Sequence, residues 1–331
     1  MPANLPPQYV KAEEEYRRAS NPADRLEILR ELFRLLPKHK GTEKLQAELK
    51  QKISRARDDV EGSKASGKKP GATSWRVPTE GAGQIVLLGP PNSGKSAILA
   101  SLTHARPEIA AYPFTTRSPG PGMMQVQDVS VQLVDLPPIS ADFFEGWMPG
   151  IVRSANAALL VADLADDDGA EAIQAVLDRL SQVHVDLVGE LPFDCEDEAT
   201  QHIKTLVVAN KFDDDDAEGR LELLREWIGP RFPVLAVSTA NFAGLDELRR
   251  NAYDLLGVMR VYTKVPGKPV DRAHPFTVPI GASVMDLARE VHRDFERTLK
   301  HARVWGSGVF DAQAVGRDHE LRDGDIVELH A

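Results

Sequence analysis

Eight consecutive residues near position 90 have the composition of a phosphate-binding loop. They read Gly89-Pro90-Pro91-Asn92-Ser93-Gly94-Lys95-Ser96 and match the pattern G-x-x-x-x-G-K-[ST]. Glycines let the backbone close around phosphate groups so that several N–H groups point inward. The pattern places Lys95 against the β- and γ-phosphates and the Ser96 hydroxyl on Mg²⁺. We therefore predict a nucleoside triphosphate site with Mg²⁺ at this loop.

A second motif, Asn210-Lys211-Phe212-Asp213, bears on which base is bound. The Asp213 carboxylate can accept hydrogen bonds from N1–H and N2–H₂ of guanine, two donors that adenine lacks. Asn210 can reach the edge of the base, and the stem of Lys211 can lie over its face. A base without the two donors would leave the carboxylate unpaired, which makes such a site selective. The motif predicts GTP and GDP as ligands; the alternative is an ordinary loop with a solvated acidic run.

The residues around both motifs predict the elements that position them. The apolar run 84–88 precedes the first motif, a helical pattern follows it, and the apolar run 205–209 leads into the second. Strand and helix patterns alternate throughout 84–257, which predicts an α/β fold with a mainly parallel sheet that binds ligands at the carboxyl ends of its strands. The predicted strands are 84–88, 123–128, 130–134, 157–162, 205–209 and 234–237.

Residues 1–61 predict an N-terminal helical hairpin. Asn21 and Pro22 suit the start of a helix, and Thr42 opens a second helix with apolar residues on one face. A packing unit and an arm for RNA or a protein partner both remain open for this segment. Residues 62–82 are rich in Gly, Ser, Lys and Pro and predict a linker. The expected domains are a helical arm (1–61), a linker (62–82), a nucleotide-binding domain (83–258) and a C-terminal domain (261–331).

The C-terminal residues 261–331 predict a small α+β grasp fold. Extended segments open it, and a helix should begin at Ser283 as N-cap, with Asp286 in its first turn and apolar positions as far as Leu299. Short strands follow. Cations are expected along one face of this helix, where ion pairs with neighbouring acids and contacts to RNA both explain them. These cations are Arg289, Arg293, Arg297 and Lys300.

Charge and composition limit the classes of partner. The 331 residues carry a net charge of −10, distributed as +5 over residues 1–70, −14 over 71–260 and −1 over 261–331. The acidic central part should not bind nucleic acid non-specifically, so any RNA contact must be local. No apolar run approaches the roughly 18 residues that span a bilayer, which predicts no membrane partner. The single cysteine, Cys195, excludes an internal disulfide and fits a cytoplasmic protein.

With these motifs in this order, the chain resembles GTPases of the Obg superfamily, and most closely the developmentally regulated GTP-binding protein (DRG) family. Its C-terminal part is similar to a TGS domain, through the segments Val261-Tyr262-Thr263-Lys264, Val304-Trp305-Gly306 and Gly316-Arg317-Asp318-His319. The resemblance implies a Ras-like P-loop G domain and a ubiquitin-like β-grasp (TGS) domain. It also implies GTP hydrolysis and association with the ribosome or structured RNA, with a protein partner at the N-terminal helices or the TGS-like domain as a further expectation.

The resemblance assigns further site residues. Thr116 is implied as the switch I threonine that closes on Mg²⁺, and Asp135 as the switch II acid in the outer shell of the metal. Ser238 and Thr239 are implied as the last guanine segment, in which the Thr239 N–H meets O6 of the base. Asn92 is implied to help hold a K⁺ ion; the alternative is that it only shapes the loop.

The chain departs from the family pattern in switch II. Pro138 replaces the glycine of Asp-x-x-Gly and has no N–H to donate to the γ-phosphate, unless the neighbouring Ile139 N–H takes over. Ile139 also stands where a glutamine would orient water. The expected reaction is therefore slow GTP hydrolysis, with Lys95, Thr116 and Asn92 in catalytic roles. The alternative is a GTP/GDP-sensing ribosome or RNA adaptor that hydrolyses little or not at all.

Overall fold

The computed structural model describes residues 77–103, 120–141, 143–192, 199–306 and 308–330, together with Ile28, Leu29, Leu32, Phe33 and Leu35. The chain divides into two compact units, Met1–Ser74 and Trp75–Ala331. In the first unit, Leu29 and Leu32 are buried helical residues. The rest of the predicted hairpin, most of the predicted linker, and the segments with Thr116 and Cys195 lie outside the described residues.

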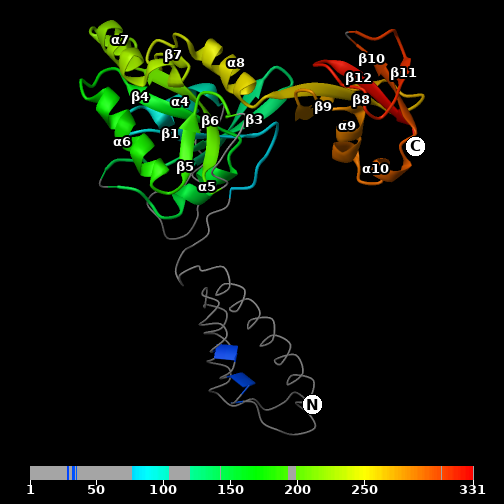
Figure 1. Cartoon of the computed structure of the whole chain (residues 1–331), viewed down its shortest axis with the longest axis horizontal. Helices are drawn as coiled ribbons and strands as arrows, with labels where there is room; N and C mark the ends of the chain where they lie inside the picture. Colours follow the sequence, from blue (N-terminus) through cyan, green and yellow to red (C-terminus); the bar gives the residue numbers. More distant parts are fainter. Residues whose placement is uncertain are drawn as a thin grey trace. The chain divides into compact units, whose positions relative to one another are not determined.

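A seven-stranded sheet, here called the first sheet, carries both sequence motifs (Figure 1). Its order is β2-β3-β1-β4-β6-β5. Strand β5 pairs with the start of β6, and β7 pairs with β6 farther along, at Val207–Ala209. Every pairing is parallel except that of β2 with β3. The mainly parallel sheet is therefore confirmed. The strands are β1 (Gln84–Leu88), β2 (Gly120–Val126), β3 (Val129–Asp135), β4 (Ala157–Asp163), β5 (Val185–Val188), β6 (Gln201–Asn210) and β7 (Val234–Ala236).

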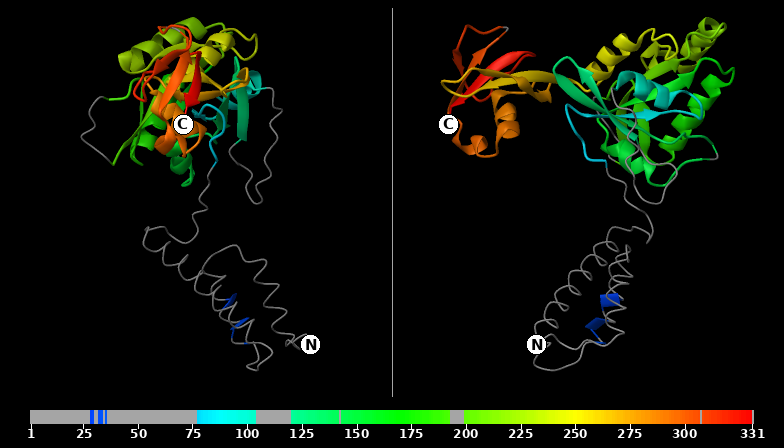
Figure 2. Two further views of the ribbon diagram at one scale, coloured as in Figure 1. Left: turned by 90° about the vertical axis from the view of Figure 1, so that its right-hand side faces the viewer. Right: turned by 180° about the vertical axis from the view of Figure 1, so that it is seen from behind.

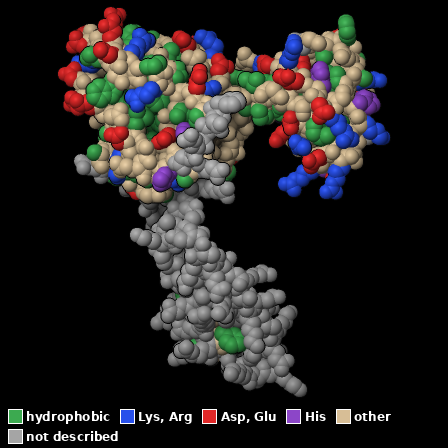
Figure 3. Space-filling model, in the orientation of Figure 1, with side chains coloured by type: hydrophobic (Ala, Val, Ile, Leu, Met, Phe, Trp, Pro, Cys, Tyr) green, Lys and Arg blue, Asp and Glu red, His purple; other side chains and the backbone are tan. Residues whose placement is uncertain are grey.

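Helices cover both faces of the first sheet (Figure 2). On one face lie α4 (Lys95–Leu102) and α8 (Leu245–Leu255), and on the other lie α5 (Met148–Ser154), α6 (Gly169–Ser181) and α7 (Ala217–Ile228). Strand β1 is buried throughout because its side chains alternate between the two apolar clusters that these helices form. None of the helices in the described ranges has the length and apolarity needed to cross a bilayer. Acidic side chains gather around α7 (Figure 3).

Strand β5 is the one described strand of the first sheet that the sequence did not predict. Its four residues pair with Gln201–Lys204, at the start of β6. Strand β6 is correspondingly longer than the predicted 205–209. An alternating pattern of four residues beside an acidic segment is too short to distinguish a strand from a loop.

The C-terminal residues form a second, five-stranded sheet in the order β11-β10-β12-β8-β9. One pairing, β8 with β12, is parallel, and the others are antiparallel. Helix α9 (Val284–Val291) contributes to a separate apolar cluster on this sheet. The predicted grasp fold is confirmed. The strands are β8 (Val258–Lys264), β9 (Val270–Pro279), β10 (His301–Trp305), β11 (Gln313–Val315) and β12 (Asp325–His330).

The predicted start of the C-terminal helix is confirmed, but its predicted length is wrong. Ser283 and Asp286 form a reciprocal capping box at the N-terminus of α9. The helix ends at Val291 because His292 adopts an extended conformation, and the chain resumes as α10 (Phe295–Thr298). This break lets Phe295 and Leu299 reach the apolar cluster from a separate turn.

The break also changes the expected row of cations. The four basic residues at 289, 293, 297 and 300 do not share one continuous helical face, because the chain leaves the helix between them. Arg289 forms ion pairs with Asp286 and with Glu296, each with an N···O distance of 3.2 Å. Ion pairing of Arg289 is thus observed. Both ion pairs are exposed and contribute little to stability.

A polar cluster lies where the turn between β2 and β3 meets β8. The Arg260 guanidinium donates to Asp128 at 3.0 Å and to Asp323 at 2.6 Å, and the Tyr262 hydroxyl donates to Asp128 at 2.5 Å. The hydrogen bond with Asp323 is the largest contribution that raises the pKa of Arg260. Burial opposes ionisation of Asp128, but the bonds from Tyr262 and Arg260 hold its pKa below the usual range.

Candidate nucleotide-binding site

The phosphate-binding loop joins β1 to α4 and depends on two of its glycines. Gly89 and Gly94 have φ angles of +152° and +90°, in the region that favours glycine. A Cβ atom at position 94 would lie 2.2 Å from Nδ2 of Asn210, and one at position 89 would lie 2.5 Å from the Val161 carbonyl oxygen. The loop therefore has room for backbone alone at these two points. Asn92, which is exposed, also adopts a positive φ, +61°.

The Lys95 ammonium is held inside this loop. Its Nζ donates to the carbonyl oxygens of Gly89 at 3.0 Å and Pro90 at 2.8 Å. Burial lowers the pKa of Lys95 to about 8, although the negative charge of Asp135 opposes the shift. An anion bound in the loop would restore a higher pKa by favouring the charged form. The position suits the predicted role of Lys95 at the phosphates.

Ser96 and Asp135 lie together, as a Mg²⁺ site requires. The Ser96 hydroxyl donates to Oδ2 of Asp135, while Oδ1 is buried without a hydrogen-bond partner among the described residues. Burial raises the pKa of Asp135, opposed by the Ser96 hydrogen bond and the charge of Lys95. A hydroxyl ligand beside an unsatisfied carboxylate oxygen fits a hard cation whose other ligands are phosphate and water, with Asp135 in its outer shell. The third predicted ligand, Thr116, is not among the described residues.

A cavity of about 670 Å³ opens beside these groups. It is lined by Pro91, Asn92, Gly94, Lys95, Ser96, Ala97, Asp135, Leu136, Pro137 and Pro138. A larger hollow of about 1070 Å³ lies between α6, β5, β6 and α8, and none of the predicted site residues lines it. The smaller cavity is therefore the candidate for the phosphate end of a nucleotide.

Switch II is attached directly to the phosphate-binding loop. The Ile139 N–H donates to the Gly89 carbonyl oxygen at 3.1 Å, and the Ile139 side chain is fully buried in the apolar core. This N–H was the alternative to the donor that Pro138 lacks, and here it is already engaged. The Ile139 side chain also has no polar atom that could orient water, as its identity in the sequence predicts.

The predicted guanine residues meet at the carboxyl ends of β6 and β7. Asp213 is exposed, and its Oδ1 accepts a hydrogen bond from the fully buried Ser238 hydroxyl. The Ser238 oxygen in turn accepts from the N–H groups of Ala240 and Asn241, each at 3.2 Å. Ser238 thus fixes the direction of the Asp213 carboxylate, and Thr239 follows it in the same turn.

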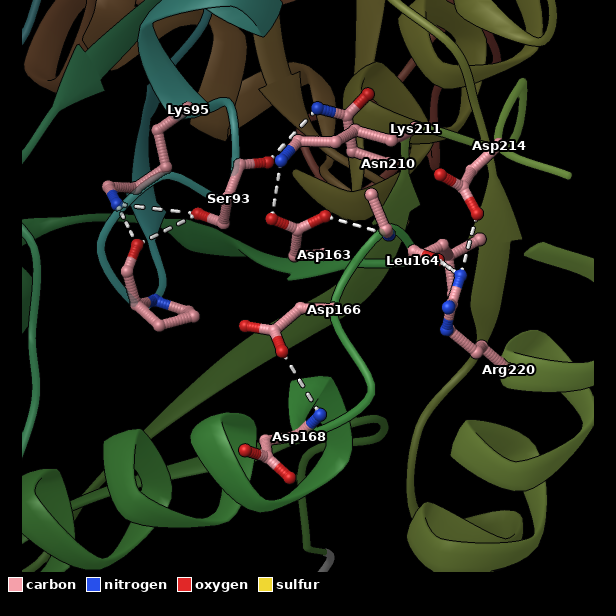
Figure 4. A network of polar contacts seen from close by, with 12 residues as sticks. Ser93, Lys95, Asp163, Leu164, Asp166, Asp168, Asn210, Lys211, Asp214 and Arg220 are labelled. Atoms are coloured by element: carbon pink, nitrogen blue, oxygen red, sulfur yellow. Dashed lines mark hydrogen bonds and ion pairs between the residues drawn. The ribbon is translucent and has the colours of Figure 1, made fainter. Parts of the chain in front are cut away.

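The two sequence motifs touch through Asn210. Its side chain is fully buried, and Nδ2 donates to the Ser93 carbonyl oxygen at 3.0 Å (Figure 4). Its Oδ1 has no hydrogen-bond partner among the described residues. The contact joins the loop that follows β1 to the end of β6, so the residues predicted for phosphate and for base lie together.

The structure adds Asp163, a residue that the motifs did not identify. It ends β4, is 8% exposed, and accepts from Lys211 Nζ at 2.5 Å (Figure 4). Arg220, on α7, forms ion pairs with Asp214 in the loop after β6, at 2.6 Å, and with Asp167 in the loop after β4, at 2.8 Å. An acid at the carboxyl end of a fully apolar strand is a signal that could have indicated Asp163.

Comparison with protein families agrees with this geometry. Residues 84–211 match the model of the family described as "50S ribosome-binding GTPase", and residues 259–331 match that of the TGS domain. The first match spans β1 to Lys211, and the second spans the five-stranded second sheet. The two matches correspond to the two resemblances inferred from the sequence.

Individual relatives match most of the chain. "Developmentally-regulated G-protein 1" of Arabidopsis thaliana is 27% identical, over 88% of this chain and 87% of its own length. "Ribosome-interacting GTPase 1" of Saccharomyces cerevisiae is 25% identical, over 94% and 99%. The YchF GTPase structure from Schizosaccharomyces pombe aligns with a TM-score of 0.50 and 13% identity, covering 77% of this chain and 99% of that one. At that identity, it supports the fold alone.

The motifs, the fold and these matches agree on one class of protein. The Ras-like P-loop fold with a mainly parallel sheet and the C-terminal TGS domain are both present. The chain is a GTP-binding protein with a P-loop GTPase domain and a TGS domain, and it is similar along most of its length to developmentally regulated GTP-binding proteins.

Proposed function

We propose that this protein hydrolyses GTP slowly to GDP and phosphate and acts as a ribosome-associated switch in the cytoplasm. The observation that carries the proposal is the hydrogen bond between Asn210 and the Ser93 carbonyl oxygen, because it joins a guanine motif to a phosphate-binding loop. The ribosome is part of the proposal because the matching family is described as "50S ribosome-binding GTPase" and the yeast relative is named "Ribosome-interacting GTPase 1". Contact with RNA, and a protein partner at the N-terminal helices or the TGS domain, belong to the same proposal.

In the proposed hydrolysis, one group of site residues stabilises charge on the phosphates and another holds Mg²⁺. Lys95, held at two loop carbonyls, stabilises negative charge on the phosphates, and the loop N–H groups do the same. Ser96, Asp135 and Thr116 would hold Mg²⁺, which neutralises charge on the β- and γ-phosphates when it is bound. Water attacks in line with the bond that breaks. Ile139 offers no group to orient that water, which supports slow turnover.

The second candidate is a GTP/GDP-sensing adaptor with little or no turnover. Pro138 and the bond from Ile139 to Gly89 favour it, since position 138 has no N–H and that of position 139 is already engaged. The paired Ser96 and Asp135 favour the enzyme. Turnover measured in KCl with saturating Mg²⁺ separates the two.

Asp213→Asn tests base selection. An amide cannot accept both guanine donors, so GTP binding should weaken by about 2–3 kcal/mol, while affinity for xanthosine nucleotides should rise. Competition titrations with both nucleotides measure the change. Asp215→Asn, two residues away and exposed, is the control and should leave both affinities unchanged. Unaltered GTP binding in Asp213→Asn would remove Asp213 from the site.

Pro138→Gly tests the missing switch II donor. A hydrogen bond to a charged group contributes about 1.5–3 kcal/mol, so restoring an N–H should raise the ratio of GTP to GDP affinity roughly 10- to 100-fold. Turnover should rise as well. Pro137→Gly loosens the same segment without adding a donor at position 138, and it should change neither quantity. A Pro138→Gly variant that matches the parent in both would rule out a blunted switch.

Exchange of the monovalent cation tests the role of Asn92. If Asn92 helps hold a catalytic K⁺, turnover in NaCl should be at least several-fold lower than in KCl at equal ionic strength. Asn92→Ala should abolish that difference without abolishing GTP binding. Equal turnover of the parent in the two salts would show that Asn92 only shapes the loop.

Sedimentation with ribosomes tests the partner. The full chain should pellet with ribosomes to different extents in GDP and in a non-hydrolysable GTP analogue. Deletion of residues 1–61, which carry 13 Lys and Arg against 11 Asp and Glu, should weaken the association and its dependence on salt, because counterion release scales with the phosphates neutralised. If the deletion changes nothing, the TGS domain is the better candidate for the contact. Pelleting of neither form would contradict a ribosomal partner.

A further inference from the structure

We propose that Asp163 is a positioning residue for the guanine base and acts by anchoring Lys211. The inference rests on the proposed guanine site. Asp163 is the last residue of β4, and β4 lies between β1 and β6, whose ends carry the two motifs. The carboxylate therefore lies at the carboxyl edge of the sheet, between the phosphate-binding loop and the base motif.

Both oxygens of Asp163 are engaged. Oδ1 accepts from the Ala165 N–H at 2.9 Å, which fixes the carboxylate against its own loop. Oδ2 accepts from Lys211 Nζ at 2.5 Å (Figure 4). Because Asp163 is 8% exposed, the ion pair is shielded from water on the carboxylate side and is stronger than one between two exposed groups.

Hydrogen bonds of the neighbouring peptide groups also hold the backbone at Lys211. Its φ is +64°, a conformation uncommon for a residue other than glycine. The neighbouring peptide groups maintain it, since the Leu164 N–H donates to the Asn210 carbonyl oxygen and the Phe212 N–H donates to the Val237 carbonyl oxygen, both at 3.0 Å. The Lys211 side chain is thus attached at both ends.

A stem attached at both ends can serve as a preformed wall for a flat base. The Lys211 side chain is 35% exposed, whereas that of Asp163 is 9% exposed, so part of the lysine side chain is open to a ligand and the anchor is not. The methylene groups supply an apolar surface of the kind that the base motif predicts for Lys211. Without the anchor the side chain would regain several rotatable bonds, and the nucleotide would have to immobilise them on binding.

The experiment compares Asp163→Asn, Lys211→Met and the double variant in the full chain. Asp163→Asn preserves size and the acceptor for Ala165, and Lys211→Met preserves an apolar stem without the ammonium. Release of fluorescent GDP and of a fluorescent GTP analogue should quicken about ten-fold in each single variant. The factor should be equal for both nucleotides, because the anchor acts at the base and not at the γ-phosphate. The double variant should release no faster than the faster single one.

The matched control is Asp167→Asn, which removes an ion pair with Arg220 from the same loop at a side chain that is 87% exposed. It should leave both release rates unchanged. Unchanged release in Asp163→Asn, or effects that multiply in the double variant, would overturn the anchoring role while guanine binding stands. Should Asp163→Asn not fold, unchanged release in Lys211→Met overturns it equally. A parent chain that binds adenine nucleotides as well as guanine nucleotides would overturn the proposed site together with the anchor.

Discussion

The site depends on the burial of one side-chain amide between two loops. Asn210 is fully buried, and it occupies the space that a side chain at Gly94 would need. Its hydrogen bond to the Ser93 carbonyl oxygen replaces the water that both groups would otherwise bind. The loop after β1 can keep its shape only while β6 ends in the correct register, and β4, between them, sets that register. The residues proposed for phosphate binding and those proposed for base recognition are therefore parts of one packing arrangement.

The same edge of the sheet carries the charges of the site. Lys95 and Asp135 lower each other's cost of burial, and Lys211 and Asp163 form a second pair nearer the base motif. A buried charge without a partner is costly, so these four residues are expected to tolerate substitution of one member poorly. The exposed ion pairs of Arg289 on α9 carry no such constraint.

Most of this arrangement can be read from the sequence, because motif and strand coincide. The apolar runs before Lys95 and before Asn210 predict buried parallel strands, and parallel strands bring their carboxyl ends to one edge. What escaped prediction depends on tertiary context. Strand β5 is four residues long, and it is stabilised by pairing with the start of β6. Helix α9 ends at Val291 because His292 is extended, and no Gly or Pro near His292 in the sequence predicts this end.

Some site residues were likewise predicted from motifs, whereas others depend on the fold. Asp213 and Ser238 are predicted separately, by two motifs, and the hydrogen bond between them is a product of the fold. Asp163 belongs to no motif that we recognised, because its role depends on the strand order, which places β4 between β1 and β6. Thr116 and the predicted N-terminal arm remain predictions.

The bond between Ile139 and Gly89 has a consequence for what the protein can report. It joins switch II to the phosphate-binding loop without any contribution from a γ-phosphate. A ligand shifts a conformational equilibrium only as far as it binds one state better than the other. If this bond persists with either nucleotide bound, switch II keeps the same contact with the loop in both forms. A difference between the GTP-bound and GDP-bound forms would then have to arise outside the contact between switch II and this loop.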